Sequence, residues 1–175
     1  IDRGLVGSEM CIRDRDYRSG TIRDMENLTR QVQEFGGLTV WDLSHSAGIF
    51  PVQLNRCRVD FAVGCTYKYL NGGPGAPAYL YAASRHHTAC NQPLSGWFGH
   101  ARPFDFERHF DPDSGIRRFV CGTQPILSLR ALQSGLEIYQ DVSLQQVREK
   151  SMALTDLFIK LLKNECAAWE LEIIS

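Results

Sequence analysis

The chain has 175 residues with 19 basic and 20 acidic side chains, so its formal net charge is −1, and 43% of its residues are hydrophobic. These values are typical of globular domains and exclude a disordered charged tail, a collagen-like repeat and a disulfide-dense miniprotein. The near-zero charge argues against nucleic-acid binding, and there is no run of about 20 apolar residues that would span a membrane. The six cysteines form no C-x-x-C pair, so we expect free thiols in a cytoplasmic protein.

The two ends of the chain differ from its middle. Residues 1–15 show no clear hydrophobic period, and GLVGSEMCIRDR at residues 4–15 resembles translated sequencing-adapter sequence. We therefore expect a non-native leader that takes no part in the fold. The chain begins with Ile1 instead of Met, and residues 171–175 resemble the start of an apolar strand. We expect an internal fragment of a longer protein.

A helix and two strands are predicted after the leader. Asp24 can cap a helix that ends at Gly36 and carries one apolar face, formed by Met25, Leu28, Val32 and Phe35. The apolar run 38–41 predicts a strand that ends at Asp42, and 59–65 predicts a second strand, apolar enough to be covered on both faces. The intervening segment of about fifteen residues suits a crossover between parallel strands.

The second half of the chain reads as one more strand, a long loop and two helices. A turn at 71–75 leads to a strand at 78–82, and 91–124 resembles a long loop of the kind that usually has a function. Helices are expected at 126–139 and 143–163, in the core or at an interface. The order of elements predicts an α/β fold with a mostly parallel sheet and flanking helices.

Two polar residues follow the predicted strands at equivalent ends. Asp42 alone reads as the cap of the next turn, and Lys68 alone reads as a surface charge. They lie 26 positions apart (42 to 68), beyond the carboxyl ends of consecutive strands, where ligands of α/β sheets bind. An amine and a carboxylate facing one cleft fit pyridoxal phosphate, because the amine bonds the cofactor and the acid keeps its pyridine nitrogen protonated. This spacing by itself is common in α/β proteins.

Four segments carry a resemblance to a known family: WDLSHSAG at 41–48, GCTYKYLNGGPG at 64–75, PLSGWFGH at 93–100 and CGTQPI at 121–126. They resemble kynureninases, over essentially all of residues 16–175. The resemblance implies a pyridoxal-phosphate enzyme of the aminotransferase-like (fold type I) architecture, usually a homodimer. It implies that residues 16–140 belong to the large cofactor-binding domain and 141–175 to a helix and the start of the small domain.

The resemblance also implies a role for each matching residue. Lys68 would bond the cofactor and later move protons, with Tyr67 as an acid that also hydrogen-bonds the phosphate. Asp42 would pair with the pyridine nitrogen, and His45 would contact the ring from the same turn. The remaining cofactor contacts implied are Trp97 and Thr123, at the phosphate, either within one subunit or across the dimer interface.

The reaction that the resemblance implies is hydrolysis of L-kynurenine to anthranilate and L-alanine, in tryptophan degradation or NAD biosynthesis. The sequence does not rank kynurenine against 3-hydroxykynurenine. In the family, the N-terminal third supplies a phosphate-binding helix and the C-terminal domain an arginine for the substrate carboxylate. Neither is present here, so we expect the isolated chain to be inactive.

Two rival readings stay open at this point. One is a cysteine desulfurase or another class V aminotransferase-like enzyme, which shares the acid and the lysine. The other is a non-catalytic paralogue that acts as a binding or structural protein. A metal site at His86, His87 and Cys90 is disfavoured because adjacent histidines face opposite ways. We expect no metal, no nucleic acid and no membrane partner.

Overall fold

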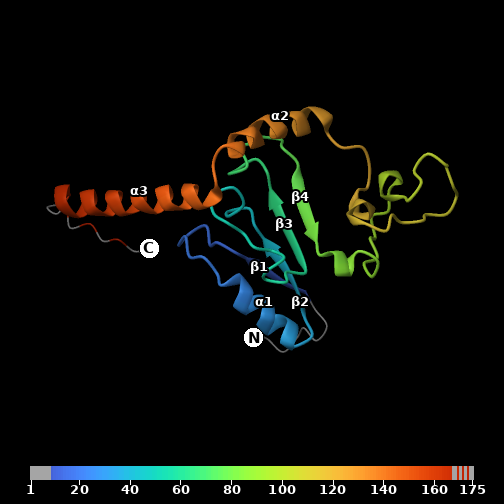
Figure 1. The fold of residues 1–175 in the computed structure, drawn as a ribbon, viewed down its shortest axis with the longest axis horizontal. Coiled ribbons are helices and arrows are strands. Elements are labelled where there is room, and N and C mark those ends of the chain that lie inside the picture. The colour runs from blue at the N-terminus through green and yellow to red at the C-terminus, as the bar shows by residue number, and fades with distance from the viewer. Residues whose placement is uncertain (1–8, 167–168, 170, 172, 174–175) are drawn as a thin grey trace.

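The described chain is built on a four-stranded sheet. The computed structural model describes residues 9–166, 169, 171 and 173. The strands lie in the order β1-β2-β3-β4, where β1, β2 and β3 are parallel and β4 is antiparallel to β3 (Figure 1). Their bounds are Glu9–Arg13, Leu38–Asp42, Phe61–Cys65 and Ala78–Ala82. The predicted α/β class with a mostly parallel sheet is confirmed.

Helix α1, Met25–Glu34, begins where the sequence predicts. The Asp24 carboxylate accepts a hydrogen bond from the backbone N–H of Asn27 at 3.0 Å, which satisfies one of the free donors of the first turn. Gly36, at φ +74°, ends the helix. Phe35 was expected on the apolar face, but it occupies the C-cap position and is 90% exposed. Helix α1 ends at Glu34, so Phe35 does not extend its apolar face.

The core lies between α1 and the sheet. Trp41 of β2 is fully buried, and its indole N–H donates to the hydroxyl of Thr29 on α1 at 3.0 Å. This bond satisfies the only polar atom of a large apolar side chain, so the tryptophan can be buried without penalty. The buried apolar cluster comprises Ile12, Trp41, Leu43, Val59 and Ala62.

Strand β1 comes from the segment that the sequence left outside the fold. Glu9–Arg13 pair with β2 over their whole length, with Ile12 opposite Trp41. Ile12 joins the core cluster. The expectation that this segment takes no part in the fold is therefore wrong for Glu9–Arg13. The non-native origin of residues 1–15 stays a prediction, and residues 1–8 lie outside the described part.

The end of the sheet opposite Asp42 is tied together by Asp60, which precedes β3 and is 2% exposed. One carboxylate oxygen accepts from Arg85 at 2.6 Å and bonds His86 at 2.8 Å. The other accepts from the backbone N–H of Thr39 and the side chain of Gln33, both at 3.0 Å. Burial would raise the pKa of Asp60, but these hydrogen bonds outweigh it and hold the pKa well below its usual value.

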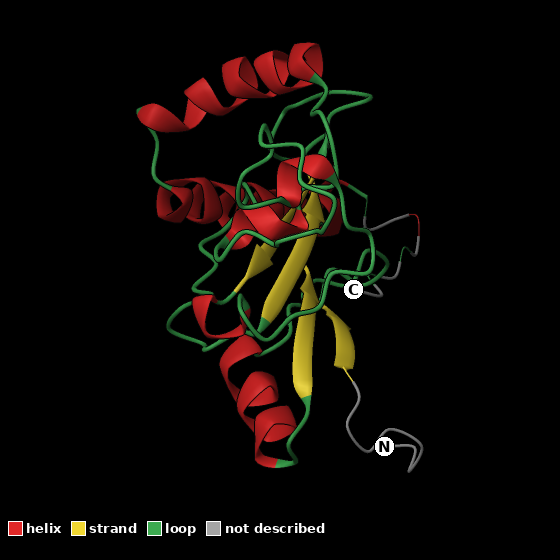
Figure 2. Cartoon of the chain, turned by 90° about the vertical axis from the view of Figure 1, so that its right-hand side faces the viewer, coloured by secondary structure: helices red, strands yellow, loops and turns green. Residues whose placement is uncertain are grey.

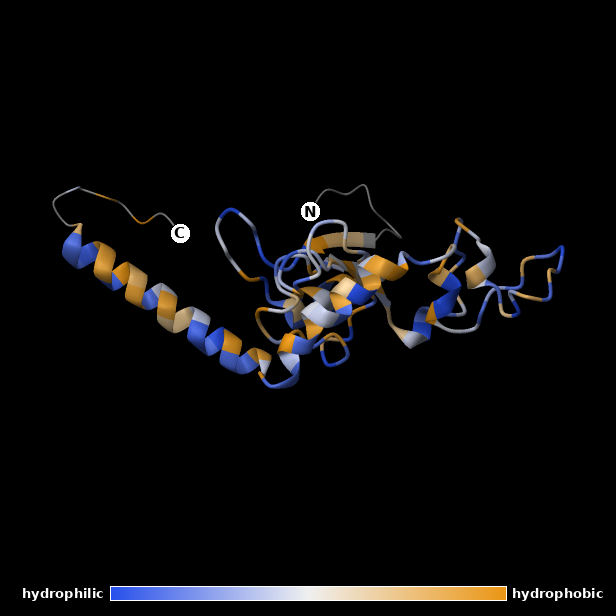
Figure 3. Cartoon of the chain, turned by 90° about the horizontal axis from the view of Figure 1, so that it is seen from above, coloured by the Kyte–Doolittle hydropathy of each residue, from blue (hydrophilic) through white to orange (hydrophobic). Residues whose placement is uncertain are grey.

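The helices of the second half frame the sheet without entering its core. Short 3-10 helices η1 (Ser84–His86), η2 (Trp97–Gly99) and η3 (Ile116–Phe119) precede α2 (Ile126–Glu137), η4 (Ile138–Gln140) and α3 (Leu144–Glu165). Figure 2 shows the two long helices beside the strands, and Figure 3 shows α3 running outward with apolar and polar residues along its length.

No described residue of α2 or α3 is buried, so the expectation that they form core is wrong for this chain. The strand expected from residue 171 lies partly outside the described residues. Within the described part, no helix has the length and apolar character needed to cross a bilayer.

Candidate functional site

Asp42 is the last residue of β2 and closes the turn that follows it. Its Oδ1 accepts from the backbone N–H of Ser44 at 2.9 Å, and Oδ2 lies 3.6 Å from Nε of Arg13. Burial would raise the pKa of Asp42, but the hydrogen bonds from Ser44 and the charge of Arg13 outweigh it, so the pKa lies below its usual value. The carboxylate is therefore ionised at neutral pH and one of its oxygens has only a long ion-pair contact.

Lys68 lies in a closed turn after β3. The backbone N–H of Gly72 donates to the carbonyl of Thr66 at 2.9 Å, and that of Asn71 to the carbonyl of Lys68 at 3.2 Å. Asn71 takes φ +61°, a conformation that asparagine tolerates better than most residues. The half-buried lysine is thus presented from a fixed backbone.

The central contact of the site joins the two turns. Nζ of Lys68 lies 2.9 Å from Nε2 of His45, three residues after Asp42. Burial and the nearby charge of Lys68 hold the pKa of His45 below its usual value, so the imidazole is neutral and Nε2 can accept. The imidazole also stacks on Tyr17, with ring centroids 6.3 Å apart.

Tyr67 is 51% exposed, and its ring lies 5.6 Å from Nζ of Lys68. This cation–π arrangement places the aromatic group directly beside the amine. The structure therefore brings together four of the predicted residues: Asp42, His45, Tyr67 and Lys68.

Two close approaches that the sequence analysis missed hold the turns in register. A Cβ at Gly48 would lie 2.5 Å from the carbonyl oxygen of Tyr69, so only glycine allows the His45 turn to approach the Lys68 turn. The hydroxyl of Tyr139, from η4, donates to that same carbonyl and accepts from the amide of Asn71. Tyr139 is the last residue of the helix predicted at 126–139, and nothing in the sequence sets it apart.

Trp97 and Thr123 lie in a separate lobe formed by residues 91–124, beyond β4 (Figure 1). Gly96 packs against the carbonyl of Cys121 so closely that a Cβ would clash with it, which draws the segments carrying Trp97 and Thr123 together. Both side chains are exposed, and neither has a hydrogen bond or ring contact to the Lys68 group among the described residues.

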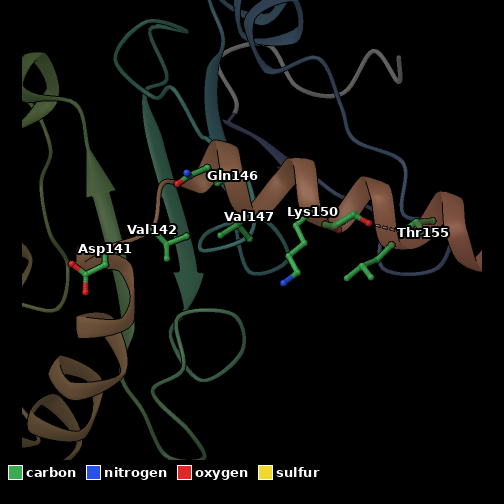
Figure 4. Close-up of a pocket in the computed structure, with 8 residues that line it drawn as sticks. Asp141, Val142, Gln146, Val147, Lys150 and Thr155 are labelled. Atoms are coloured by element: carbon green, nitrogen blue, oxygen red, sulfur yellow. Dashed lines mark hydrogen bonds between the residues drawn. The ribbon is translucent and has the colours of Figure 1, made fainter.

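One groove in the described chain lies apart from this group of residues. It has a volume of about 670 Å³, runs along the first turns of α3, and is lined by residues between Asp141 and Thr155 (Figure 4). No predicted site residue lines it. No cluster of three or more potential metal ligands occurs among the residues described.

The residues around Lys68 fit pyridoxal phosphate. The cofactor needs an amine for its aldehyde and an ionised carboxylate for its pyridinium nitrogen, and Lys68 and Asp42 supply both groups. The Nδ1 atom of His45 is buried without a hydrogen-bond partner in the described chain, as expected at a site where a bound ligand supplies the partner.

Comparisons with known proteins agree with this geometry. The sequence matches the aminotransferase class-V family over residues 11–168. It is 49% identical over 160 residues to a kynureninase of Burkholderia mallei and 48% identical to one of Pseudomonas fluorescens. These alignments cover 91% of the chain, which spans 38% of each relative.

Solved structures show the fold. Cysteine desulfurase CsdA of Escherichia coli superposes with a TM-score of 0.73 at 20% identity, over 90% of this chain and 38% of that one. A C-DES mutant with glycine linked to its PLP cofactor superposes with a TM-score of 0.77 at 14% identity, over 90% and 42%. The chain belongs to the aminotransferase class-V family, whose cofactor is pyridoxal phosphate.

Proposed function

We propose that the complete protein is a kynureninase, which hydrolyses L-kynurenine to anthranilate and L-alanine. Hydrolysis of 3-hydroxykynurenine to 3-hydroxyanthranilate and L-alanine stays an open alternative. The observation that carries this proposal is the Lys68–His45–Asp42 arrangement in a chain that is 49% identical to kynureninases. Because the chain spans 38% of those relatives, the activity belongs to the longer protein.

Each residue has a task that its surroundings suit. When bound, pyridoxal phosphate supplies a ring that withdraws electrons from the carbon next to the substrate amine. Asp42, ionised beside Arg13, would accept a hydrogen bond from the protonated pyridine nitrogen. Lys68 would hold the cofactor through its amine and, when free, would move protons at the substrate carbon. Tyr67, at the same amine, is the acid.

Trp97 and Thr123 are proposed phosphate contacts. Both are exposed on the lobe of residues 91–124, and among the described residues neither contacts the Lys68 group. This supports an arrangement in which they serve the site of a second copy. This is the reason to propose a homodimer. We also propose that residues 16–140 form part of the large domain and that 141–175 lead into the small one.

A cytoplasmic location is supported by cysteine chemistry. All six cysteines are free thiols in the structure, as in proteins kept reduced.

The rival desulfurase reading rests on the shared fold, at 20% identity, and is therefore weaker. The test is a product assay on the complete protein. Supplied with L-kynurenine, it should release anthranilate and L-alanine, and with L-cysteine it should release no sulfide. Sulfide or a keto acid as the product would favour the rival enzymes. No product at all, together with no cofactor bound, would favour a binding protein. We expect the isolated 175-residue chain to release no anthranilate.

A further inference from the structure

We infer that His45 is a positioning residue for Lys68 in the cofactor-free protein, where it holds the lysine amine and accepts its proton before the cofactor is bonded. This inference rests on the proposed function only for the identity of the aldehyde. The contact itself joins Nζ of Lys68 to Nε2 of His45 at 2.9 Å.

The geometry fixes which atom accepts. A lysine ammonium only donates, so Nε2 must be the acceptor and the proton of the neutral imidazole must be on Nδ1. The Nδ1 atom is buried with no acceptor in the described chain, so this tautomer is kept at a cost. Among the described residues, the contact with Lys68 is the one hydrogen bond that the His45 ring makes, and it offsets part of this cost.

The surrounding charges keep the imidazole neutral, and therefore able to accept a proton, until a ligand arrives. Arg13 and Arg15, at the end of β1, and Lys68 disfavour a charged imidazole, while Asp42 favours it. Tyr17 and Tyr67 flank the pair with their rings. Approach of an anionic, phosphate-bearing ligand adds negative charge and would shift the balance towards the imidazolium.

The bonding step balances with these groups alone. One proton moves from Nζ to Nε2, and the freed lone pair forms the C–N bond with the aldehyde carbon. The aldehyde oxygen then leaves as water with the two hydrogens that stayed on Nζ. Without His45, the ammonium form has no described partner to take its proton.

The first experiment measures amine reactivity in the complete protein prepared without cofactor. Trace labelling with acetic anhydride, read by mass spectrometry, gives the ratio of label at Lys68 to label at Lys150, an exposed lysine of α3 that serves as internal reference. The ratio should fall about tenfold in His45→Phe, which keeps the ring but removes the acceptor. An unchanged or higher ratio would overturn the inference.

The second experiment follows covalent capture of added pyridoxal phosphate by absorbance. His45→Phe should slow capture by roughly 100-fold, the lower end of what a positioned proton acceptor contributes. His45→Gln, which can hold the amine but takes up no proton, should also be slower than wild type. Capture at the wild-type rate in either variant contradicts the proton role. His109→Phe, at an exposed histidine, is the control and should change nothing.

These two experiments separate this inference from the proposed function. If the wild-type protein never captures the cofactor while the labelling ratio still depends on His45, the proposed function fails and the His45 inference stands. If the cofactor is captured at Lys68 at equal rates in all variants, the His45 inference fails and the proposed function stands.

Discussion

Gly48 and Tyr69 approach each other so closely that a Cβ at Gly48 would lie 2.5 Å from the carbonyl oxygen of Tyr69. This approach joins the turn that carries His45 to the turn that carries Lys68. Gly48 also has φ +97°, so an alanine there is strained by its backbone and by its surroundings.

Gly48→Ala should therefore lower the free energy of unfolding by more than backbone strain alone. Gly36→Ala is the matched control, because Gly36 has φ +74° but nothing within 4 Å of the added Cβ. We expect a loss of about 1–2 kcal/mol in the control and roughly 1–3 kcal/mol more at Gly48. Chemical denaturation of both variants measures the difference, and equal losses would show that the close approach has no energetic role.

Tyr139→Phe should loosen the Lys68 turn. The lost hydroxyl bonds the carbonyl of Tyr69 and the amide of Asn71, so we expect about 1 kcal/mol less stability and slower capture of pyridoxal phosphate. Tyr81→Phe is the control, because it loses a comparable bond, to Asn55 at 2.8 Å, that does not involve the Lys68 turn. The control should lose similar stability and capture cofactor normally. A capture defect shared by both variants would count against a specific role for Tyr139.

Asp60→Asn should destabilise the protein by about 2 kcal/mol at neutral pH, because it removes the charge of a buried carboxylate whose hydrogen bonds include one from the partly exposed Arg85. The pKa of Asp60 is lower in the folded state than in the unfolded state. Its stabilisation is thus fully present above the unfolded value and is lost as the pH falls towards the folded value. Unfolding measured from neutral to acid pH should show the wild-type advantage shrinking on acidification; an advantage independent of pH would contradict this account.

Asp14 should behave in the opposite way. It is 2% exposed, and neither carboxylate oxygen has a hydrogen-bond partner in the described chain. Burial raises its pKa in the folded state, so the charged form costs stability above that pKa and the cost disappears as the pH falls. Asp14→Ala should raise the free energy of unfolding at neutral pH by roughly 1–3 kcal/mol. A gain that stays constant down to acid pH would show that ionisation is not its cause.

The strand ends that carry the site could be predicted because local patterns determine them. Apolar runs bounded by a polar residue set the end of β2 at Asp42 and the end of β3 at Cys65, and both agree with the structure. The cap at Asp24 is equally local. The order of these elements then sufficed for the fold class.

The contacts between the turns could not be predicted, since they join distant parts of the chain. Tyr139 and Tyr69 are 70 residues apart, and a helix-face pattern shows nothing of a hydroxyl that reaches a distant carbonyl. Asp60 falls within the strand predicted at 59–65, whereas β3 begins at Phe61, and the role of Asp60 shows only when Arg85 and His86 are placed beside it. Strand β1 was missed because residues 1–15 were interpreted as a non-native leader, although Glu9–Arg13 pair with β2 and Ile12 packs in the core.

The central claim is that Lys68 and Asp42 hold one pyridoxal-phosphate ring between them. The most direct measurement is borohydride reduction of the complete protein with bound cofactor, followed by mass spectrometry of its peptides. The account predicts a single reduced adduct, on Lys68, and loss of the yellow absorbance in Lys68→Ala. An adduct on another lysine, or a Lys68→Ala protein that keeps the yellow absorbance, would contradict it.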